Sequence, residues 1–195
     1  MYRVRLEQVV GSTNVAVERI AFDSRNVVPF TAFVATRGTQ VDGHDFINKA
    51  IEGGANAIIC EELPTELKDG VSYVRVADAA STLGIMAANF FDLPAKQLKL
   101  VGITGTNGKT SVATLLFRLF RALGHKCGLI STVEIRIGTR TIPSTHTTPD
   151  SVRLNELLAE MISEGVAYCF MEVSSPSVVH ERIAGLRFTA GVFTN

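Results

Sequence analysis

The sequence predicts an α/β protein, in which a small N-terminal α/β domain is followed by the first part of a phosphate-loop domain with a mostly parallel sheet. Short β-rich runs alternate with helical patterns through the first half. An apolar run at 98–104 leads into a glycine-rich loop and then into an amphipathic helix pattern. Residues 166–173, VAYCFMEV, are almost all apolar, which is typical of a strand buried on both faces of a parallel sheet.

In the first half, β-branched and apolar runs bounded by turn residues predict four strands, at 17–22, 31–36, 56–60 and 72–76. A turn-like segment separates the first two. Residues 42–55 predict a helix closed by glycines. Asp78 is positioned to cap a second helix at 79–91, and Pro94 lies just beyond its last turn.

The second half continues the alternation. The predicted strands are 98–104, 127–132, 133–137, 166–173 and a last one within 188–195. A helix at 111–123 should stop at Gly124, and its predicted apolar face is Val112, Leu115, Leu116, Leu119 and Leu123. A second helix is expected at 149–163, with Thr148 as its cap and Pro149 at its first position. The polar, proline-bearing segment 92–97 is the best boundary, which gives domains 1–94 and 95–195.

Composition excludes several classes of protein. Basic and acidic side chains are equal at 19 each, which removes the electrostatic argument for nucleic acid or an anionic membrane. No apolar run approaches the ~20 residues of a membrane span, and the first residues lack a signal-peptide pattern. Cys60, Cys127 and Cys169 lie far apart in apolar runs, which favours buried free thiols and a reducing cytoplasm. Without zinc-type spacing of Cys or His, any metal would bind through oxygens.

The glycine loop carries the chemistry. Residues 101–112, VGITGTNGKTSV, contain three glycines at three-residue spacing: Gly102, Gly105 and Gly108. Between a strand and a helix, such a loop directs backbone N–H groups and the positive end of the helix toward a phosphate, and Lys109 adds a charge. The common pattern G-x-x-x-x-G-K-[ST] requires glycine at position 103, which is an isoleucine here. The alternative is an ordinary glycine turn before a helix with an exposed lysine.

This G-x-x-G-x-x-G-K-T loop resembles the ATP-binding loop of the Mur ligases of bacterial peptidoglycan synthesis, and also that of folylpolyglutamate synthetases. Residues 22–60 resemble the uridine-binding N-terminal domain of Mur ligases. Residues 144–151 and 171–195 resemble substrate-binding segments of the branch that adds the third stem-peptide residue to UDP-N-acetylmuramoyl-dipeptide. The resemblance covers essentially the whole chain. It implies a UDP-sugar-binding domain at 1–94 and an incomplete central ATP-binding domain at 95–195.

The resemblance also implies residue roles. The loop residues that match the ATP site are Gly105, Thr106, Asn107, Gly108, Lys109, Thr110 and Ser111. Lys109 would act on the β/γ-phosphates as the catalytic residue. The positions that match substrate-binding residues are Ser24, Thr147, Thr148, Ser174, His180 and Arg182. Turn capping is an alternative role for Ser24, helix capping for Thr148, and simple surface exposure for Arg182.

The residues expected to bind a metal ion are Thr110 and Glu172. Glu172 ends an apolar strand, where a carboxylate of an open α/β sheet points into the usual ligand crevice, and Mg²⁺ prefers oxygen ligands. Three positions depart from or only partly match the family. Pro176 stands where the family has His, Phe30 stands where a turn glycine is usual, and His44 matches a uridine-side position or is a surface histidine.

The implied activity is ATP-dependent amide bond formation. The γ-phosphoryl group of ATP activates the D-glutamate carboxylate of UDP-N-acetylmuramoyl-L-alanyl-D-glutamate as an acyl phosphate, which the amine of diaminopimelate or lysine then attacks. Family members are considerably longer, so we expect this chain to be a truncated, inactive N-terminal portion that binds UDP-sugar or nucleotide at most weakly. The alternatives are another Mur or folylpolyglutamate-type ligase, or a nucleotide- or UDP-sugar-binding module without catalysis. The sequence leaves open which amino acid is added, and the oligomeric state.

Overall fold

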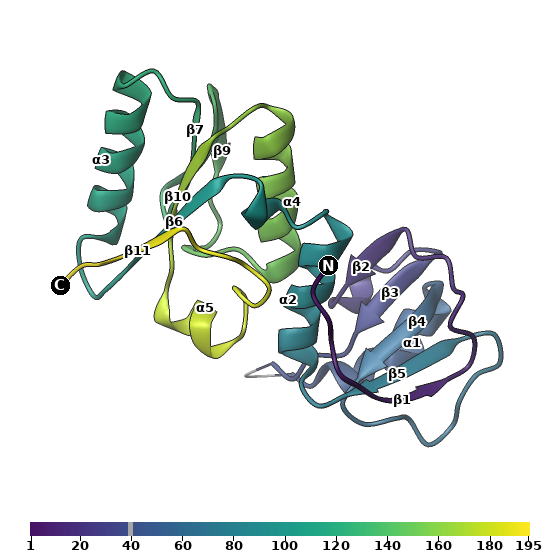
Figure 1. Ribbon diagram of the computed structural model, residues 1–195. Helices are drawn as coiled ribbons and strands as arrows, with labels where there is room; N and C mark the ends of the chain where they lie inside the picture. The colour runs from purple at the N-terminus through teal and green to yellow at the C-terminus, as the bar shows by residue number, and fades with distance from the viewer. Residues whose placement is uncertain (39–40) are drawn as a thin grey trace. The chain divides into compact units, whose positions relative to one another are not determined.

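The computed structural model describes residues 1–38 and 41–195, and its contacts divide the chain into two compact units (Figure 1). One unit is Arg3–Leu83, and the other is Gly84–Asn195 together with Met1–Tyr2. Each contains its own sheet and its own buried core. The predicted α/β class is confirmed, whereas the predicted domain boundary after residue 94 stays a prediction. In the part of the chain that the structure describes, no helix is long and apolar enough to cross a membrane.

The N-terminal unit is a five-stranded sheet in the order β1-β5-β4-β3-β2. The strands are β1 Leu6–Val10, β2 Arg19–Ala21, β3 Thr31–Val34, β4 Ala55–Cys60 and β5 Ser72–Val76. The last four are parallel and confirm the four predicted strands, while β1 adds an antiparallel edge. The 3₁₀ turns η1 Ser24–Asn26 and η2 Gly43–Phe46 precede the short helix α1 Ile47–Glu52. Gly53 and Gly54 follow α1, with Gly54 in the left-handed conformation at φ 103°.

Helix α2 spans Ala79–Phe90. As predicted, an Asp78 carboxylate oxygen accepts from the Ser81 N–H at 2.8 Å. Beyond the helix, Asp92 and Leu93 both have positive φ, and the 3₁₀ turn η3 Pro94–Lys96 then begins. Ala95 in this turn is part of the core of the C-terminal unit.

The C-terminal unit is a six-stranded sheet in the order β11-β6-β10-β7-β8-β9. The strands are β6 Lys99–Thr104, β7 Cys127–Ile130, β8 Glu134–Ile137, β9 Arg140–Pro143, β10 Tyr168–Glu172 and β11 Ala190–Phe193. The first four in spatial order are parallel, and β7-β8-β9 form an antiparallel meander. Helices α3 Lys109–Ala122, α4 Ser151–Ser163 and α5 Ser175–Val179 complete the unit.

Strand β10 is buried on both faces, as its apolar sequence predicts. Phe170 packs with Ala113 and Phe117 of α3, whereas Cys169 and Met171 pack in the cluster that contains α4. The side chains alternate between faces along the strand, so α3 and α4 cover opposite faces of the sheet (Figure 1).

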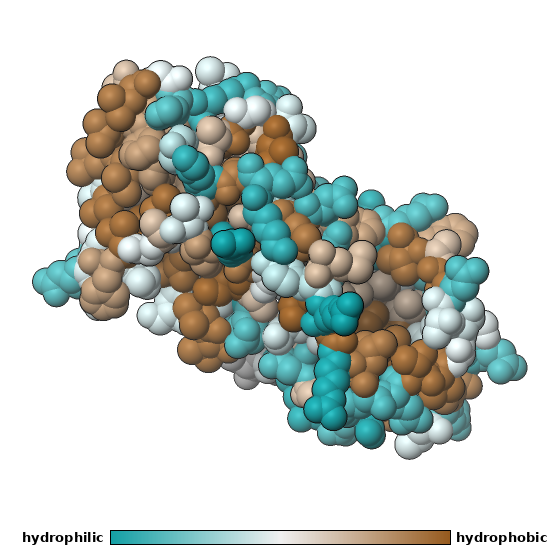
Figure 2. Space-filling view, viewed as in Figure 1, coloured by the Kyte–Doolittle hydropathy of each residue, from teal (hydrophilic) through white to brown (hydrophobic). Residues whose placement is uncertain are grey.

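The predicted apolar face of α3 is wrong in part. Leu115, Leu119 and Leu123 are 63%, 53% and 64% exposed, and the buried residues of α3 are Ala113 and Phe117. The helix is apolar on more than one side, so the 3.6-residue period alone did not select the side that faces the sheet. Figure 2 shows the resulting hydrophobic surface over this helix.

The predicted start of the helix at 149–163 is also wrong. The helix begins at Ser151, and its cap is Asp150, whose carboxylate accepts from the Arg153 N–H at 2.9 Å. Thr148 therefore does not cap this helix.

Candidate functional site

The glycine loop connects the carboxyl end of β6 to the first turn of α3. Gly105 and Gly108 have φ values of 137° and 83°, which side-chain-bearing residues rarely adopt. Helix α3 begins at Lys109 with Gly108 as its cap, and no side-chain hydrogen bond closes this end of the helix among the described residues. A strand, a loop with positive φ and an uncapped helix N-terminus are together the architecture of a phosphate-binding loop.

The ammonium group of Lys109 lies over this loop. Its Nζ donates to the carbonyl oxygens of Gly105 at 2.7 Å and Thr106 at 3.1 Å. The positive charge is therefore held at the point where the loop would receive an anion. Thr110, next along the helix, is half-buried, and Ser111 is exposed.

A residue that the sequence did not single out closes the other side of the loop. The Thr194 hydroxyl lies 2.6 Å from the Asn107 carbonyl oxygen and 3.0 Å from that of Thr104, and the Asn107 N–H donates to the Asn195 carbonyl at 2.6 Å. A Cβ on Gly105 would lie 2.3 Å from the backbone oxygen of Thr194. The loop conformation thus requires glycine at position 105. Thr194 adjoins it because β11 pairs with β6.

Glu172 lies at the same edge of the sheet. It ends β10 opposite Ile103 of β6, one residue before β6 ends at Thr104 and leads into the loop. Its side chain is buried, at 1% exposed. The Thr132 backbone N–H donates to Glu172 Oε1 at 2.9 Å, and Thr132 Oγ1 lies 3.1 Å from Oε2. A buried carboxylate is costly unless hydrogen-bonded, and these contacts supply the bonds.

Three of the predicted substrate residues form one hydrogen-bonded group beside Glu172. Thr148 Oγ1 donates to the Glu172 carbonyl at 2.9 Å and accepts from the Ser174 N–H at 3.1 Å. Arg182 Nη1 donates to the Thr148 carbonyl at 3.2 Å. The Ser174 hydroxyl accepts from the Ser177 N–H at 3.3 Å and so caps α5. The connection between Thr148 and residues 172–174 therefore arises from tertiary contact.

Thr147 joins this group from the other side, with its hydroxyl oxygen 3.0 Å from that of Thr132. His180 is exposed at the end of α5, and its ring has no hydrogen bond to the described residues. Pro176 lies in the first turn of α5, where a missing N–H is tolerated. The substitution noted in the sequence therefore leaves this helix intact.

The donor chemistry of the site fits a hard cation. No group of three or more His, Cys, Asp or Glu side chains comes together among the described residues. Glu172 supplies carboxylate oxygens and Thr110 a hydroxyl oxygen, which are the ligand types that Mg²⁺ accepts together with phosphate oxygens and water. The three thiols are buried, and burial raises the pKa of Cys127 in β7, of Cys169 in β10 and, to about 11, of Cys60 in β4, which disfavours the reactive thiolate.

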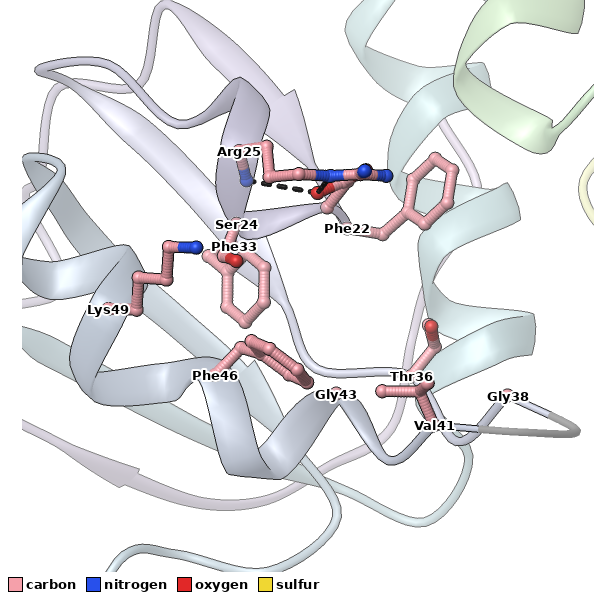
Figure 3. Close-up of a pocket in the computed structure, with 11 residues that line it drawn as sticks. Phe22, Ser24, Arg25, Phe33, Thr36, Gly38, Val41, Gly43, Phe46 and Lys49 are labelled. Carbon is pink, nitrogen blue, oxygen red and sulfur yellow. Dashed lines mark hydrogen bonds and ion pairs between the residues drawn. The ribbon is translucent and has the colours of Figure 1, made fainter.

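Ser24 lies in the N-terminal unit, in a cavity of about 520 Å³ (Figure 3). Phe22, Phe33 and Phe46 supply aromatic walls, and the close-up places the Ser24 hydroxyl and the Lys49 ammonium toward the same end. The cavity therefore combines flat apolar surface with a hydroxyl and a cation. The sequence pointed to Ser24 but missed the aromatic side chains and Lys49, which come from separate elements.

The turn that carries Ser24 is held by Asp23. Its carboxylate accepts from the Arg25 N–H at 2.9 Å and from the Arg25 guanidinium at 2.6–3.0 Å. The hydrogen bonds from Arg25 lower the pKa of Asp23. Asp23 therefore caps the turn, and Ser24 lies in the wall of the cavity.

Two further positions of this unit have structural roles. His44 Nε2 accepts from the Glu61 N–H at 3.0 Å, and its Nδ1 lies 2.6 Å from Asp42, so the ring joins η2 to the end of β4. His44 does not line the cavity. Phe30 has a φ of 64°, which explains why a glycine would suit its position.

Comparison with known proteins matches residues 16–91 to the model described as Mur ligase family, catalytic domain, and residues 103–195 to the Mur ligase middle domain. A UDP-N-acetylmuramoyl-L-alanyl-D-glutamate--2,6-diaminopimelate ligase of Cytophaga hutchinsonii is 52% identical over 100% of this chain, and one of Bacteroides fragilis is 50% identical over 96%. The chain spans 40% and 39% of the length of these two relatives.

Solved structures share the fold. A 2,6-diaminopimelate-adding ligase of the same printed name matches 92% of this chain and 36% of its own, with a TM-score of 0.79 at 24% identity. The MurF ligase of Thermotoga maritima, solved in complex with ADP, matches 87% of this chain and 35% of its own, with a TM-score of 0.51 at 23% identity.

Proposed function

Because this chain belongs to the Mur ligase family, we propose that it is the nucleotide- and sugar-peptide-binding part of an ATP-dependent ligase of peptidoglycan synthesis. The proposed reaction adds an amino acid to UDP-N-acetylmuramoyl-L-alanyl-D-glutamate. We propose diaminopimelate as that amino acid, since the relatives of Cytophaga hutchinsonii and Bacteroides fragilis are named for it. A cytoplasmic location follows from the proposed substrates, ATP and a nucleotide-linked sugar.

One observation carries the proposal. Three features gather at one edge of the sheet, where the adjacent parallel strands β6, β10 and β7 have their carboxyl ends. They are the loop with Lys109, the carboxylate of Glu172, and the Thr147–Thr148 pair, which contacts the residues at these strand ends. In an open α/β sheet this edge is where ligands bind. A phosphate cradle and hydroxyl groups beside a carboxylate suit transfer of a phosphoryl group to a bound acid.

The proposed reaction has two steps. The glutamate carboxylate oxygen attacks the γ-phosphorus of ATP, a new O–P bond forms, and the bond to ADP breaks. The amine then attacks the acyl carbon, the C–O bond to phosphate breaks, and the nitrogen releases its proton to solvent or to the departing phosphate, which leaves an amide and phosphate.

In the first step the proposed role of this chain is positioning and charge neutralisation. The loop N–H groups from Gly105 to Ser111 would hold the phosphates, and Lys109 would exchange its loop carbonyls for phosphate oxygens. Mg²⁺, when bound through Thr110 and Glu172, would neutralise charge on the phosphates.

Each unit has its own proposed ligand-binding residues. Ser24 and the aromatic cavity would take the uridine nucleotide, and Lys49 offers a cation for its phosphates. Thr147, Thr148, Ser174, His180 and Arg182 would bind or frame the peptide part. Thr148 already accepts hydrogen bonds from both Ser174 and Arg182, which supports a preformed surface.

Calorimetric titration tests the proposal. We expect the chain to bind ADP with Mg²⁺ and to bind UDP-N-acetylmuramoyl-dipeptide. The Lys109→Met variant should lose affinity for ADP and keep its affinity for the sugar-peptide. Preference for a folate over the sugar-peptide would overturn the assignment. Since the chain spans about 40% of the relatives' length, the absence of turnover by these 195 residues alone stays a prediction, checked by phosphate release in the presence of all substrates.

A further inference from the structure

Thr132 lies just after β7 and contacts the side chain of Glu172 through two of its own groups. Its backbone N–H donates to Oε1 at 2.9 Å, and its hydroxyl oxygen lies 3.1 Å from Oε2. The two oxygens of one carboxylate are thus held by one residue, which fixes the plane of the carboxylate as well as its place. Forty positions separate the two residues in sequence, and the pairing of β7 with β10 brings them together.

The same hydroxyl lies 3.0 Å from the hydroxyl oxygen of Thr147. A threonine hydroxyl has one proton to donate, and an ionised carboxylate can only accept. The hydrogen bond to the charged group is the stronger, so the proton of Thr132 goes to Glu172. The oxygen of Thr132 then accepts the proton of Thr147.

This order of donors leaves Thr147 with an oxygen that can only accept a further hydrogen bond. Its neighbour Thr148 has no such capacity to offer, because it is 1% exposed, donates to the Glu172 carbonyl and accepts from the Ser174 N–H. Of the two adjacent threonines, Thr147 alone is half-buried and accessible to a ligand.

We infer that Thr132 is a positioning residue that orients both Glu172 and Thr147, and that Thr147 accepts a hydrogen bond from an amide N–H or a hydroxyl group of the substrate. The inference rests on the proposed function, because it concerns the same site. It assigns Thr147 a donor group of the sugar-peptide as its partner.

The test compares Thr132→Val, which removes the hydroxyl and keeps the backbone N–H and the shape, with Thr132→Ser, which restores the hydroxyl. Thr141→Val, at an exposed position of β9, is the matched control. Two affinities are measured by calorimetry for each variant, that for Mn²⁺ with ADP and that for UDP-N-acetylmuramoyl-dipeptide. Protection of the buried Cys169 from a thiol reagent verifies that each variant is folded.

We expect Thr132→Val to weaken both affinities about 5- to 30-fold, the range expected for the loss of one side-chain hydrogen bond, and Thr132→Ser to stay within about twofold of the parent. In a Thr147→Val background, Thr132→Val should no longer affect the sugar-peptide and should still weaken the binding of Mn²⁺ with ADP. This double-mutant cycle separates the two contacts of the hydroxyl.

Parent-like binding by Thr132→Val would overturn the inference and leave the proposed function standing. Equal losses in Thr132→Val, Thr132→Ser and the control would also overturn it, since the hydroxyl would then not be responsible. If Cys169 is no longer protected in Thr132→Val, that variant is not folded and two others decide. The inference then requires that Thr147→Val loses affinity for the sugar-peptide and that Thr132→Ser keeps the affinity of the parent. A parent that binds neither ligand would refute the proposed function and the inference together.

Discussion

Replacing Gly105 with alanine should destabilise the C-terminal unit and distort the phosphate loop. The new Cβ would lie 2.3 Å from the carbonyl oxygen of Thr194 and 2.7 Å from its carbonyl carbon. The carbonyl group belongs to the backbone just after β11, so relief requires this segment of the chain to move. A second penalty comes from the φ of 137°, which alanine rarely adopts.

The magnitude follows from these two terms. Positive φ costs a residue with a Cβ about 1–2 kcal/mol, and overpacking against fixed atoms typically costs about 1–3 kcal/mol. We therefore expect a loss of about 2–5 kcal/mol in the free energy of unfolding. Gly124→Ala is the matched control, because Gly124 has a φ of 86° and nothing lies within 4 Å of its missing Cβ. That variant should lose about 1–2 kcal/mol.

Thiol labelling in urea measures the effect in each unit separately. Cys127 and Cys169 are buried in the C-terminal unit, and Cys60 is buried in the N-terminal unit. With a urea dependence of about 2 kcal/mol per molar, Gly105→Ala should lower the midpoint for the first two by about 1–2.5 M and leave that of Cys60 unchanged. Equal midpoints for Gly105→Ala and Gly124→Ala would refute the clash as the cause.

The remaining predictions concern both units. Lys109→Met should reduce ADP affinity at least about 10-fold in calorimetry while changing the stability by less than about 1 kcal/mol, since the lysine bonds only to loop carbonyls. Phe117→Ala should cost about 3–5 kcal/mol in urea unfolding and Leu119→Ala less than about 0.5, with equal costs contradicting the observed buried face of α3. Phe30→Gly should leave the N-terminal unit as stable or up to about 1 kcal/mol more stable, because it relieves a positive φ, and a clear loss would show that the ring matters more than the backbone. Between pH about 9 and pH about 11, the free energy of unfolding of the N-terminal unit should fall as the pH rises, because the pKa of the Cys60 thiol is raised in the folded state and the thiol ionises first in the unfolded chain. Urea titrations at several pH values should show that Cys60→Ala reduces this pH dependence.

The parts of the site that lie close together in sequence were predictable. The glycine spacing, Lys109 and the loop-to-helix junction are local, and the apolar run before Glu172 marks the end of a buried parallel strand. Periodicity and turn chemistry act over a few residues, so they find such features.

Contacts set by the order of strands were not predictable. Thr132 and Thr194 reach the site because β7 lies beside β10 and β11 lies beside β6, and no pattern along the chain specifies that order. The helix cap at Asp150 was missed for a different reason. Thr148 and Asp150 are both residue types that suit a cap, but in the structure Asp150 caps the helix and the Thr148 hydroxyl bonds to the distant Glu172 carbonyl.

The contact between Thr194 and the glycine loop has a consequence for the synthesis of the protein. The bonds from Thr194 to Thr104 and Asn107 span 90 and 87 positions of the chain. The loop can reach its described shape only after β11 has left the ribosome and paired with β6, although the residues of the loop itself emerge much earlier. At about 5–20 residues per second, the nascent loop remains without this support for some seconds. The loop thus acquires its described shape only once β11 has been followed by Thr194, 90 positions after Thr104.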